Sequence, residues 1–75
     1  YKQQSLLLAQ LLRERGEASP AELRRSGGSE RSGAILSANM YGWFDRIRRG
    51  VYRLTPEGEY ALDRYADTLR KILRS

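Results

Sequence analysis

The sequence contains no cysteine and no histidine, and it has only one tryptophan, one phenylalanine and two prolines. Without cysteine, the fold cannot contain a disulfide or a cysteine-bearing zinc finger. Without histidine, carboxylates are the remaining side-chain metal ligands, and the most common general base is missing. A serine nucleophile would lack the base that activates it. We therefore expect no metal, no cofactor and no catalytic residue in this stretch.

Long apolar runs are also absent. No stretch approaches the ~20 residues that cross a bilayer, and no signal peptide is visible, so we expect a cytoplasmic protein without a membrane partner. With 75 residues the chain can form one domain with a single modest core. Because the first residue is Tyr1 and not methionine, we expect residues 1–75 to be one domain cut from a longer protein.

Acidic residues are the minority, and the net charge of +5 is unevenly placed. Residues 42–55 contain four arginines and a single aspartate. A basic patch on a small domain is typical of proteins that bind nucleic acid. A solvated surface explains the charge alone equally well, so the position of the patch in the fold has to decide.

Two helices are predicted in the first third of the chain. Leucines at helical spacing indicate a helix over residues 2–14, and Gly16 ends it. Ser19, Pro20 and Glu22 then form a capping-box pattern, which begins a short helix over residues 20–25.

Two further helices are predicted on either side of an arginine-rich segment. Ser29 can cap a third helix that reaches about Met40, with Ile35, Leu36 and Met40 on its inner side. Thr55 followed by a proline begins a last helix, which we expect to continue to about residue 74 with a broad apolar face.

The segment between these helices predicts a β-hairpin with its turn at Arg49-Gly50, because aromatic and β-branched residues alternate with charges on both sides of a glycine. A two-residue turn sets Arg46 opposite Arg53. In this register one face of the hairpin is buried and carries Trp43, Tyr52 and Leu54. The other face carries Phe44 and the arginines Arg46, Arg48 and Arg53. That turn requires a positive φ at Arg49, an uncommon state for arginine. A three-residue turn instead sets Asp45 against Arg53 and moves Phe44 inward. We prefer the first register.

Together these elements predict a mainly α-helical protein with a small β-hairpin, arranged as a winged helix-turn-helix: three helices, a two-stranded wing and a long C-terminal helix. In such a fold the third helix enters the major groove and the wing lies along the phosphates of double-stranded DNA. Arginine can read guanine and asparagine can read adenine, although Asn39 is equally well explained as a helix C-cap. With few base-reading side chains, weak sequence specificity is expected. The predicted nucleic-acid-binding residues are Arg31, Ser37, Asn39, Arg46, Arg48, Arg49 and Arg53.

Two segments of the chain, Ile35–Ile47 and Arg49–Thr55, resemble the C-terminal domain of a bacterial family of putative PD-(D/E)XK-type phosphodiesterases. Asn39, Tyr41 and Gly42 are among the positions that match the family's pattern. The second segment is also similar to wings in Mrr-type restriction enzymes and abortive-infection antitoxins. The resemblance implies a winged helix that follows a restriction-nuclease-like domain, at the C-terminal end of the parent protein. The acid-x-Lys element of the nuclease motif is absent here, so the resemblance places catalysis upstream of Tyr1.

Two functions of different class follow. The first is an accessory DNA-binding domain that holds duplex DNA for an attached nuclease-like domain. The alternative is a protein-interaction or dimerisation domain, which would use the apolar face of the last helix to bind a partner or a second copy.

Overall fold

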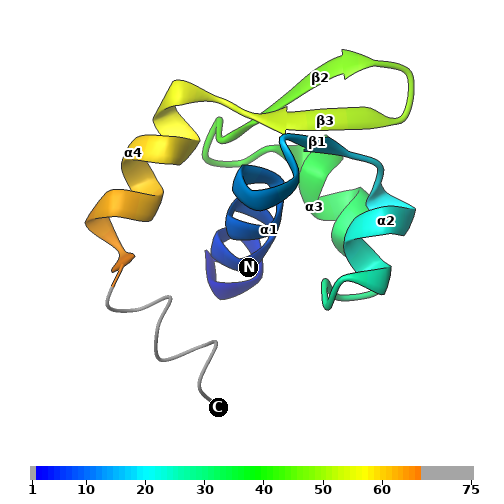
Figure 1. The fold of residues 1–75 in the computed structure, drawn as a ribbon, viewed down its shortest axis with the longest axis horizontal. Helices are drawn as coiled ribbons and strands as arrows, with labels where there is room; N and C mark the ends of the chain where they lie inside the picture. The colour runs from blue at the N-terminus through cyan, green and yellow to red at the C-terminus, as the bar shows by residue number, and fades with distance from the viewer. Residues whose placement is uncertain (1, 67–75) are drawn as a thin grey trace.

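The computed structural model describes residues 2–66, which form four helices and a three-stranded antiparallel sheet (Figure 1). The mainly helical class with a small hairpin is therefore confirmed. The last helix ends at Arg64 with Tyr65 as its C-cap, so the prediction of one unbroken helix is wrong at that point, and its expected part beyond residue 66 lies outside the described residues. A two-residue strand before the second helix was not predicted. The elements are α1 (Lys2–Arg15), β1 (Glu17–Ala18), α2 (Pro20–Arg25), α3 (Ser32–Ala38), β2 (Phe44–Arg48), β3 (Val51–Leu54) and α4 (Pro56–Arg64).

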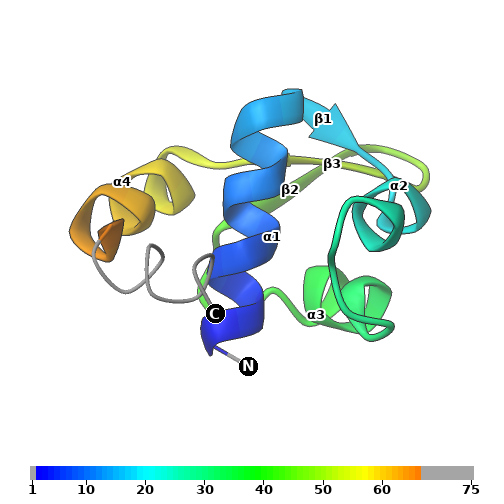
Figure 2. The same ribbon diagram turned by 60° about the horizontal axis from the view of Figure 1, so that its bottom comes forward.

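Helix α1 is the centre of the core. It lies between α4 on one side and the α2–α3 pair on the other, and the sheet covers one side of this helical layer (Figures 1 and 2). Leu6, Leu8 and Leu12 are fully buried, because leucines at this spacing point to neighbours on both sides of α1. Trp43, Phe44 and Leu62 close the core from the hairpin and from α4.

Local sequence determines α2. The Ser19 hydroxyl accepts a hydrogen bond from the Glu22 backbone N–H at 3.2 Å, and the Glu22 carboxylate accepts one from the Ser19 N–H at 3.0 Å. The predicted capping box and the bounds of α2 are confirmed. The hydrogen bond from the Ser19 backbone, and with smaller effect the Arg15 guanidinium, hold the pKa of Glu22 below its usual range.

Helix α3 is shorter at both ends than predicted. It begins at Ser32 and not near Ser29, and Asn39 ends it in the left-handed conformation, with φ 46° and ψ 47°. The prediction that Met40 faces inward is wrong, because its side chain is 71% exposed. The left-handed residue turns the chain out of the helix, so the helical spacing no longer places Met40 over the core.

The hairpin register also differs from the preferred prediction. Arg48 pairs with Val51 as predicted, but Arg46 pairs with Tyr52 and Asp45 with Arg53, so Ile47 is an extra residue in β2. Positive φ falls on Gly50, at 74°, and not on Arg49. Because glycine takes the positive φ, the backbone of Arg49 is not strained. The bulge at Ile47 then shifts the pairing of β2 with β3 by one residue.

This one-residue shift changes which side chains face the core. Phe44 pairs with Leu54 and is buried, so its predicted place on the cationic face is wrong. Trp43 is buried as predicted, whereas Tyr52 and Leu54 are half-buried and pack against the core. Since alternate residues of a strand share a face, Arg46 lies on the helix side of β2 together with Phe44.

Helix α4 begins against the hairpin. The Thr55 hydroxyl accepts a hydrogen bond from the Gly58 N–H at 3.1 Å and donates one to the Gly42 carbonyl at 2.8 Å. The predicted cap is confirmed. A Cβ on Gly58 would lie 2.5 Å from Leu54 Cδ1 and 2.7 Å from the Trp43 carbonyl oxygen, so this position admits only glycine without a shift of the backbone.

Candidate nucleic-acid interface

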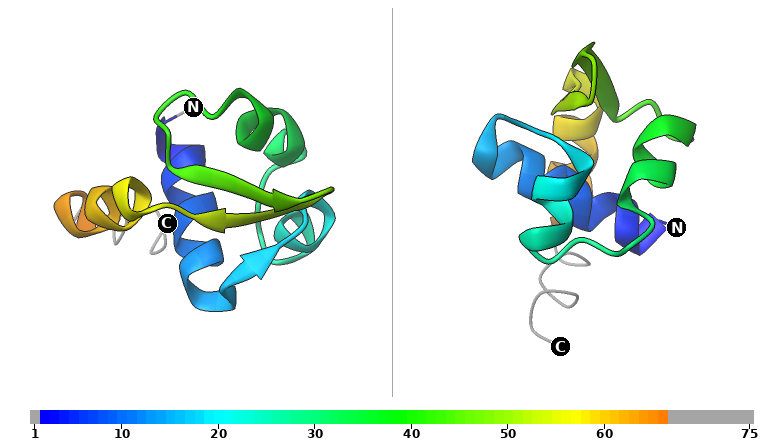
Figure 3. Two further views of the ribbon diagram at one scale, coloured as in Figure 1. Left: turned by 90° about the horizontal axis from the view of Figure 1, so that it is seen from above. Right: turned by 90° about the vertical axis from the view of Figure 1, so that its right-hand side faces the viewer.

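The structure brings three of the predicted site residues to one place. Ser37, Asn39 and Arg46 line a surface hollow of about 320 Å³ between the end of α3 and strand β2. We call it the α3–β2 hollow; its other lining residues are Leu36, Phe44 and Tyr52. Seen from above, β2 is the edge strand on the α3 side of the sheet (Figure 3).

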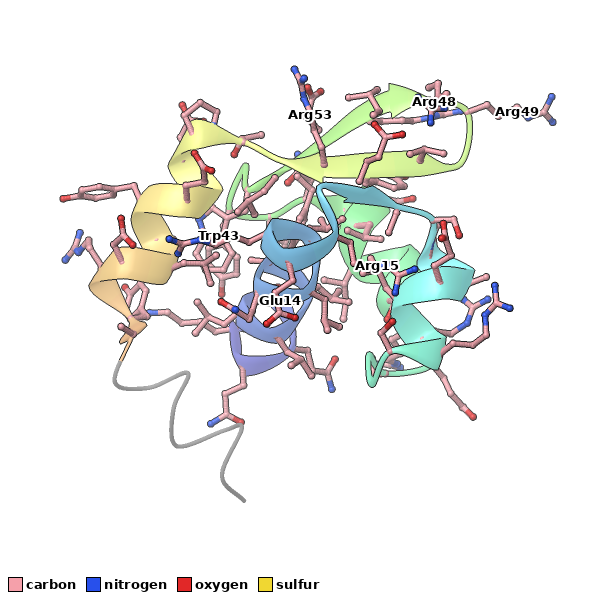
Figure 4. All side chains as sticks on the ribbon, in the orientation of Figure 1. Glu14, Arg15, Trp43, Arg48, Arg49 and Arg53 are labelled. Atoms are coloured by element: carbon pink, nitrogen blue, oxygen red, sulfur yellow. The ribbon has the colours of Figure 1, made fainter. Side chains whose placement is uncertain are left out.

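Two of the predicted wing cations lie elsewhere, on the solvent face of the sheet. Arg53 is paired with Asp45, with 3.1 Å between Nε and Oδ2, and Arg48 is paired with Glu17 of β1. Figure 4 shows Arg53 pointing away from the helices. The prediction of Arg46, Arg48 and Arg53 on a single face is therefore wrong: the bulge separates Arg46 from the other two.

These ion pairs reduce the positive charge of the solvent face. Glu17 and Asp45 neutralise Arg48 and Arg53 at the surface, where such pairs contribute little free energy and can exchange for another anion. The contact between Asp45 and Arg53 is the one that the alternative register predicted. The pairing of Arg48 with Glu17 was not predicted, because Glu17 belongs to a strand without a signal in the sequence.

Arg49 and Arg46 remain as the strongest candidates for phosphate contacts. Arg49 extends outward from the tip of the hairpin (Figure 4). Within residues 2–66 neither side chain has an ion pair, and both are exposed. The two side chains lie at different places: Arg49 is at the tip of the hairpin, whereas Arg46 is beside α3 and lines the α3–β2 hollow.

Asn39 is the C-cap of α3, the structural role that the sequence offered as the alternative to a contact with DNA. Its amide Nδ2 donates to the Phe44 carbonyl at 2.8 Å, and its Oδ1 accepts from the Phe44 N–H at 3.0 Å. This pair of bonds fixes the start of β2 against the end of α3. The helix C-cap is confirmed, while a contact of Asn39 with nucleic acid stays a prediction.

The exposed side of α3 carries small side chains. Ala34, Ser37 and Ala38 are exposed along it, and Arg31 is exposed at its N-cap. Alanine offers no hydrogen-bonding group for a base edge, so only Arg31 and Ser37 could read bases from this face. This composition agrees with the expected weak sequence specificity.

A second surface hollow, of about 460 Å³, lies on α4, and we call it the α4 hollow. The Tyr41 ring stacks on Trp43 beside it, with 4.6 Å between the ring centroids. The Lys2 ammonium donates a hydrogen bond to the Tyr65 hydroxyl at 2.9 Å, and this bond and the lysine charge lower the pKa of Tyr65. The hollow is lined by Trp43, Pro56, Glu57, Tyr60, Ala61, Arg64 and Tyr65.

Two classes of site do not occur in the part of the chain that the structure describes. Residues 2–66 hold no group of three aspartate, glutamate, histidine or cysteine side chains placed to bind a metal ion. None of the described helices has the length and apolar character needed to cross a bilayer.

A family model described as putative PD-(D/E)XK phosphodiesterase (DUF2161) matches residues 1–61. The chain belongs to this family. The resemblance noted in the sequence is thereby confirmed at the level of the family, and the matched residues include every element that forms the α3–β2 hollow. Comparison with curated proteins and with solved structures gave no match.

Proposed function

We propose that this chain is an accessory winged-helix domain that holds duplex DNA, mainly by its phosphates, for a phosphodiesterase of the PD-(D/E)XK family. The observation that carries the proposal is the position of Arg46 and Arg49. One lies between the wing and α3, the other lies at the tip, and neither has an ion pair among the described residues. Cations placed in this way are free to neutralise phosphates.

The order of the elements supports a winged helix. A helix, a short strand, two helices joined by a glycine-containing turn and a hairpin follow one another, and β1 pairs with β3 so that the hairpin is tied to the α1–α2 connection. In this arrangement α3 takes the place of the helix that enters the major groove, and β2 and β3 take the place of the wing.

The missing acid-x-Lys element supports an accessory role. The family is described by a phosphodiesterase activity, yet this sequence has no histidine and no acid-x-Lys element. The catalytic carboxylates of the parent protein would then belong to a nuclease-like domain upstream of Tyr1. The winged-helix domain formed by this chain would position the DNA, and the nuclease-like domain would cleave the phosphodiester bond.

A salt titration tests the proposal. Binding of the domain to two unrelated duplexes of equal length is measured by fluorescence anisotropy at increasing salt. We expect micromolar or weaker affinity near physiological salt, equal for both duplexes, with a log–log slope of roughly −0.9 for each phosphate contacted. Arg49→Ala should flatten the slope by about 0.9 on both duplexes. Arg48→Ala should flatten it less, because Glu17 already pairs with Arg48.

The matched control is Arg64→Ala. It removes the same charge from α4, on the opposite side of α1 from α3 (Figure 2). If Arg64→Ala weakens binding as much as Arg49→Ala does, binding reflects net charge only and the wing has no special role. Undetectable binding at low salt would also end the proposal.

The α4 hollow favours a second candidate function, a protein-interaction or dimerisation domain. Tyr60 is 64% exposed there, beside Trp43 and Tyr65. Aromatic side chains are enriched in the buried centres of protein interfaces. A surface of this kind could contact the upstream domain, another protein or a second copy. Binding that does not respond to salt or to duplex DNA would favour this function over the first.

A further inference from the structure

The polar groups of the α3–β2 hollow all can donate hydrogen bonds. Arg46 contributes a guanidinium, and Ser37 and Tyr52 contribute hydroxyls, while the Asn39 amide is already hydrogen-bonded to the Phe44 backbone. The remaining lining residues, Leu36 and Phe44, are apolar. No carboxylate is among the lining residues. A site with a guanidinium, two hydroxyls and no acid is suited to an anion with several acceptor oxygens.

The acid next to Arg46 in the sequence does not pair with it. Asp45 precedes it in β2, but alternation places the two side chains on opposite faces of the strand. The carboxylate of Asp45 is 3.1 Å from Arg53 Nε on the solvent face. The ion pairs of the outer face therefore leave the guanidinium on the helix side available.

Tyr52 stands next to Arg46 on that same side. The two residues are direct partners in the antiparallel pair β2–β3, and directly opposite residues have side chains on one face. Tyr52 is half-buried and its ring packs against the core, so it has little freedom to move. Ser37, from the last turn of α3, supplies a hydroxyl from the other wall of the hollow.

Hydrogen bonds join the two walls of the hollow. The hydrogen bonds between the Asn39 amide and the Phe44 backbone join the end of α3 to the start of β2. The Thr55 N–H donates to the Trp43 carbonyl at 2.9 Å and joins the same segment to the start of α4. A site whose walls are fixed before the ligand arrives loses less conformational entropy on binding.

We infer that the α3–β2 hollow is a binding site for one phosphate group of the DNA backbone. Arg46 supplies the charge, and the hydroxyls of Tyr52 and Ser37 donate to the phosphate oxygens. The inference rests on the proposed function, and it names Tyr52 as a binding residue that the sequence analysis assigned to the core alone. A contact of this kind fixes the register between α3, the wing and the duplex without reading a base.

The test compares a charged and an uncharged member of the site. Arg46→Ala should weaken duplex binding about ten-fold and flatten the salt slope by ~0.9, because a cation has been removed from a phosphate. Tyr52→Phe keeps the ring and its packing and removes only the hydroxyl. It should weaken binding by about two- to ten-fold and leave the slope unchanged, since a neutral donor releases no counterion.

The double variant tests whether both side chains hold the same phosphate. Arg46→Ala combined with Tyr52→Phe should weaken binding by less than the product of the two single effects, because the first change already loses the shared phosphate. A product of the single effects would place the two side chains on different groups and overturn the shared site. Urea unfolding of each variant verifies that the fold is retained.

A second measurement does not require DNA. Inorganic phosphate is added to the domain, and backbone amide NMR signals are followed with chloride at equal ionic strength as the control. We expect phosphate-specific shifts at Ser37, Arg46 and Tyr52 that are lost in Arg46→Ala. Absence of these shifts overturns the site.

The outcomes separate this inference from the proposed function. If Arg49→Ala weakens duplex binding and neither Arg46→Ala nor Tyr52→Phe does so, the hollow is not a phosphate site, although the domain still binds DNA. If no duplex binds at low salt, the proposed function fails, and the phosphate titration alone decides whether the hollow binds the anion.

Discussion

At the scale of single residues, Asn39 links the helical and the β part of the molecule. Its left-handed backbone ends α3, and its amide makes two hydrogen bonds to the backbone of Phe44. Asparagine suits both tasks, because it tolerates positive φ better than most residues and its amide carries both a donor and an acceptor. The residue therefore positions the α3–β2 hollow whether or not it contacts DNA.

Replacing Asn39 should separate these two tasks. Asn39→Gly relieves the backbone but loses both side-chain hydrogen bonds, and we expect it to lower the free energy of unfolding by about 1–2 kcal/mol. Asn39→Ala loses the bonds and adds backbone strain, so the loss should be larger by about 1 kcal/mol. Urea denaturation measures both. Equal stability of Asn39→Ala and the wild type would show that neither the bonds nor the positive φ matters.

At the scale of elements, the contact between α4 and the hairpin depends on a missing side chain. Gly58 sits in the first turn of α4, directly against Leu54 and the Trp43 carbonyl. Helix propensity alone would favour alanine at this position. The close approach of backbone atoms opposes that preference, because a carbonyl oxygen cannot move aside as a flexible side chain can.

Two glycine-to-alanine changes should therefore have opposite signs. Gly58→Ala should lower the free energy of unfolding by about 1–3 kcal/mol, since the new Cβ overlaps atoms of the hairpin. Gly33→Ala is the matched control in α3, where the nearest atom to a Cβ is Pro20 Cβ at 3.8 Å. There the same change should raise the free energy of unfolding by about 0.5–1 kcal/mol. Urea denaturation compares the two. A stabilising effect of Gly58→Ala would contradict the packing described for α4.

At the scale of the whole molecule, two different surfaces lie on opposite sides of α1. The helices α2 and α3 lie on one side of α1, and α4 lies on the other (Figure 1). Arg46 lines the α3–β2 hollow on the first side, where Arg49 also extends from the hairpin tip (Figure 4), while Tyr60 lines the α4 hollow on the second. In the proposals made above, the first surface contacts the DNA backbone and the second contacts a protein partner. Both functions could therefore coexist in one domain without competing for the same residues.

If the domain dimerises through α4, its mass in solution should depend on protein concentration. If α4 binds a second copy, sedimentation equilibrium should give a mass that rises with concentration into the high micromolar range. Tyr60→Ala should reduce that rise, because aromatic side chains contribute strongly to interfaces. Met40→Ser is the control, since Met40 is also exposed but follows the C-cap of α3, away from α4. A monomeric mass at every concentration would contradict self-association through α4.

Local physical chemistry in the sequence determined much of the fold. The bounds of α2 and the start of α4 were predictable because Ser19, Thr55 and the prolines that follow them act within one helical turn. The leucine spacing of α1 and the turn at Gly50 were predictable for the same reason. The family was recognisable from Ile35–Ile47 and Arg49–Thr55, and the acid-x-Lys element was visibly absent.

Only the tertiary structure decided where the charges lie. The alternation in the hairpin fits two registers, and the bulge at Ile47 selects the one that turns Arg46 toward α3. The pairing of Arg48 with Glu17 depends on β1, a strand of two residues that is too short to produce a period in the sequence. Contacts between residues so far apart depend on how the whole chain packs. For this reason the cations were evident from the sequence, while the face that each one occupies was not.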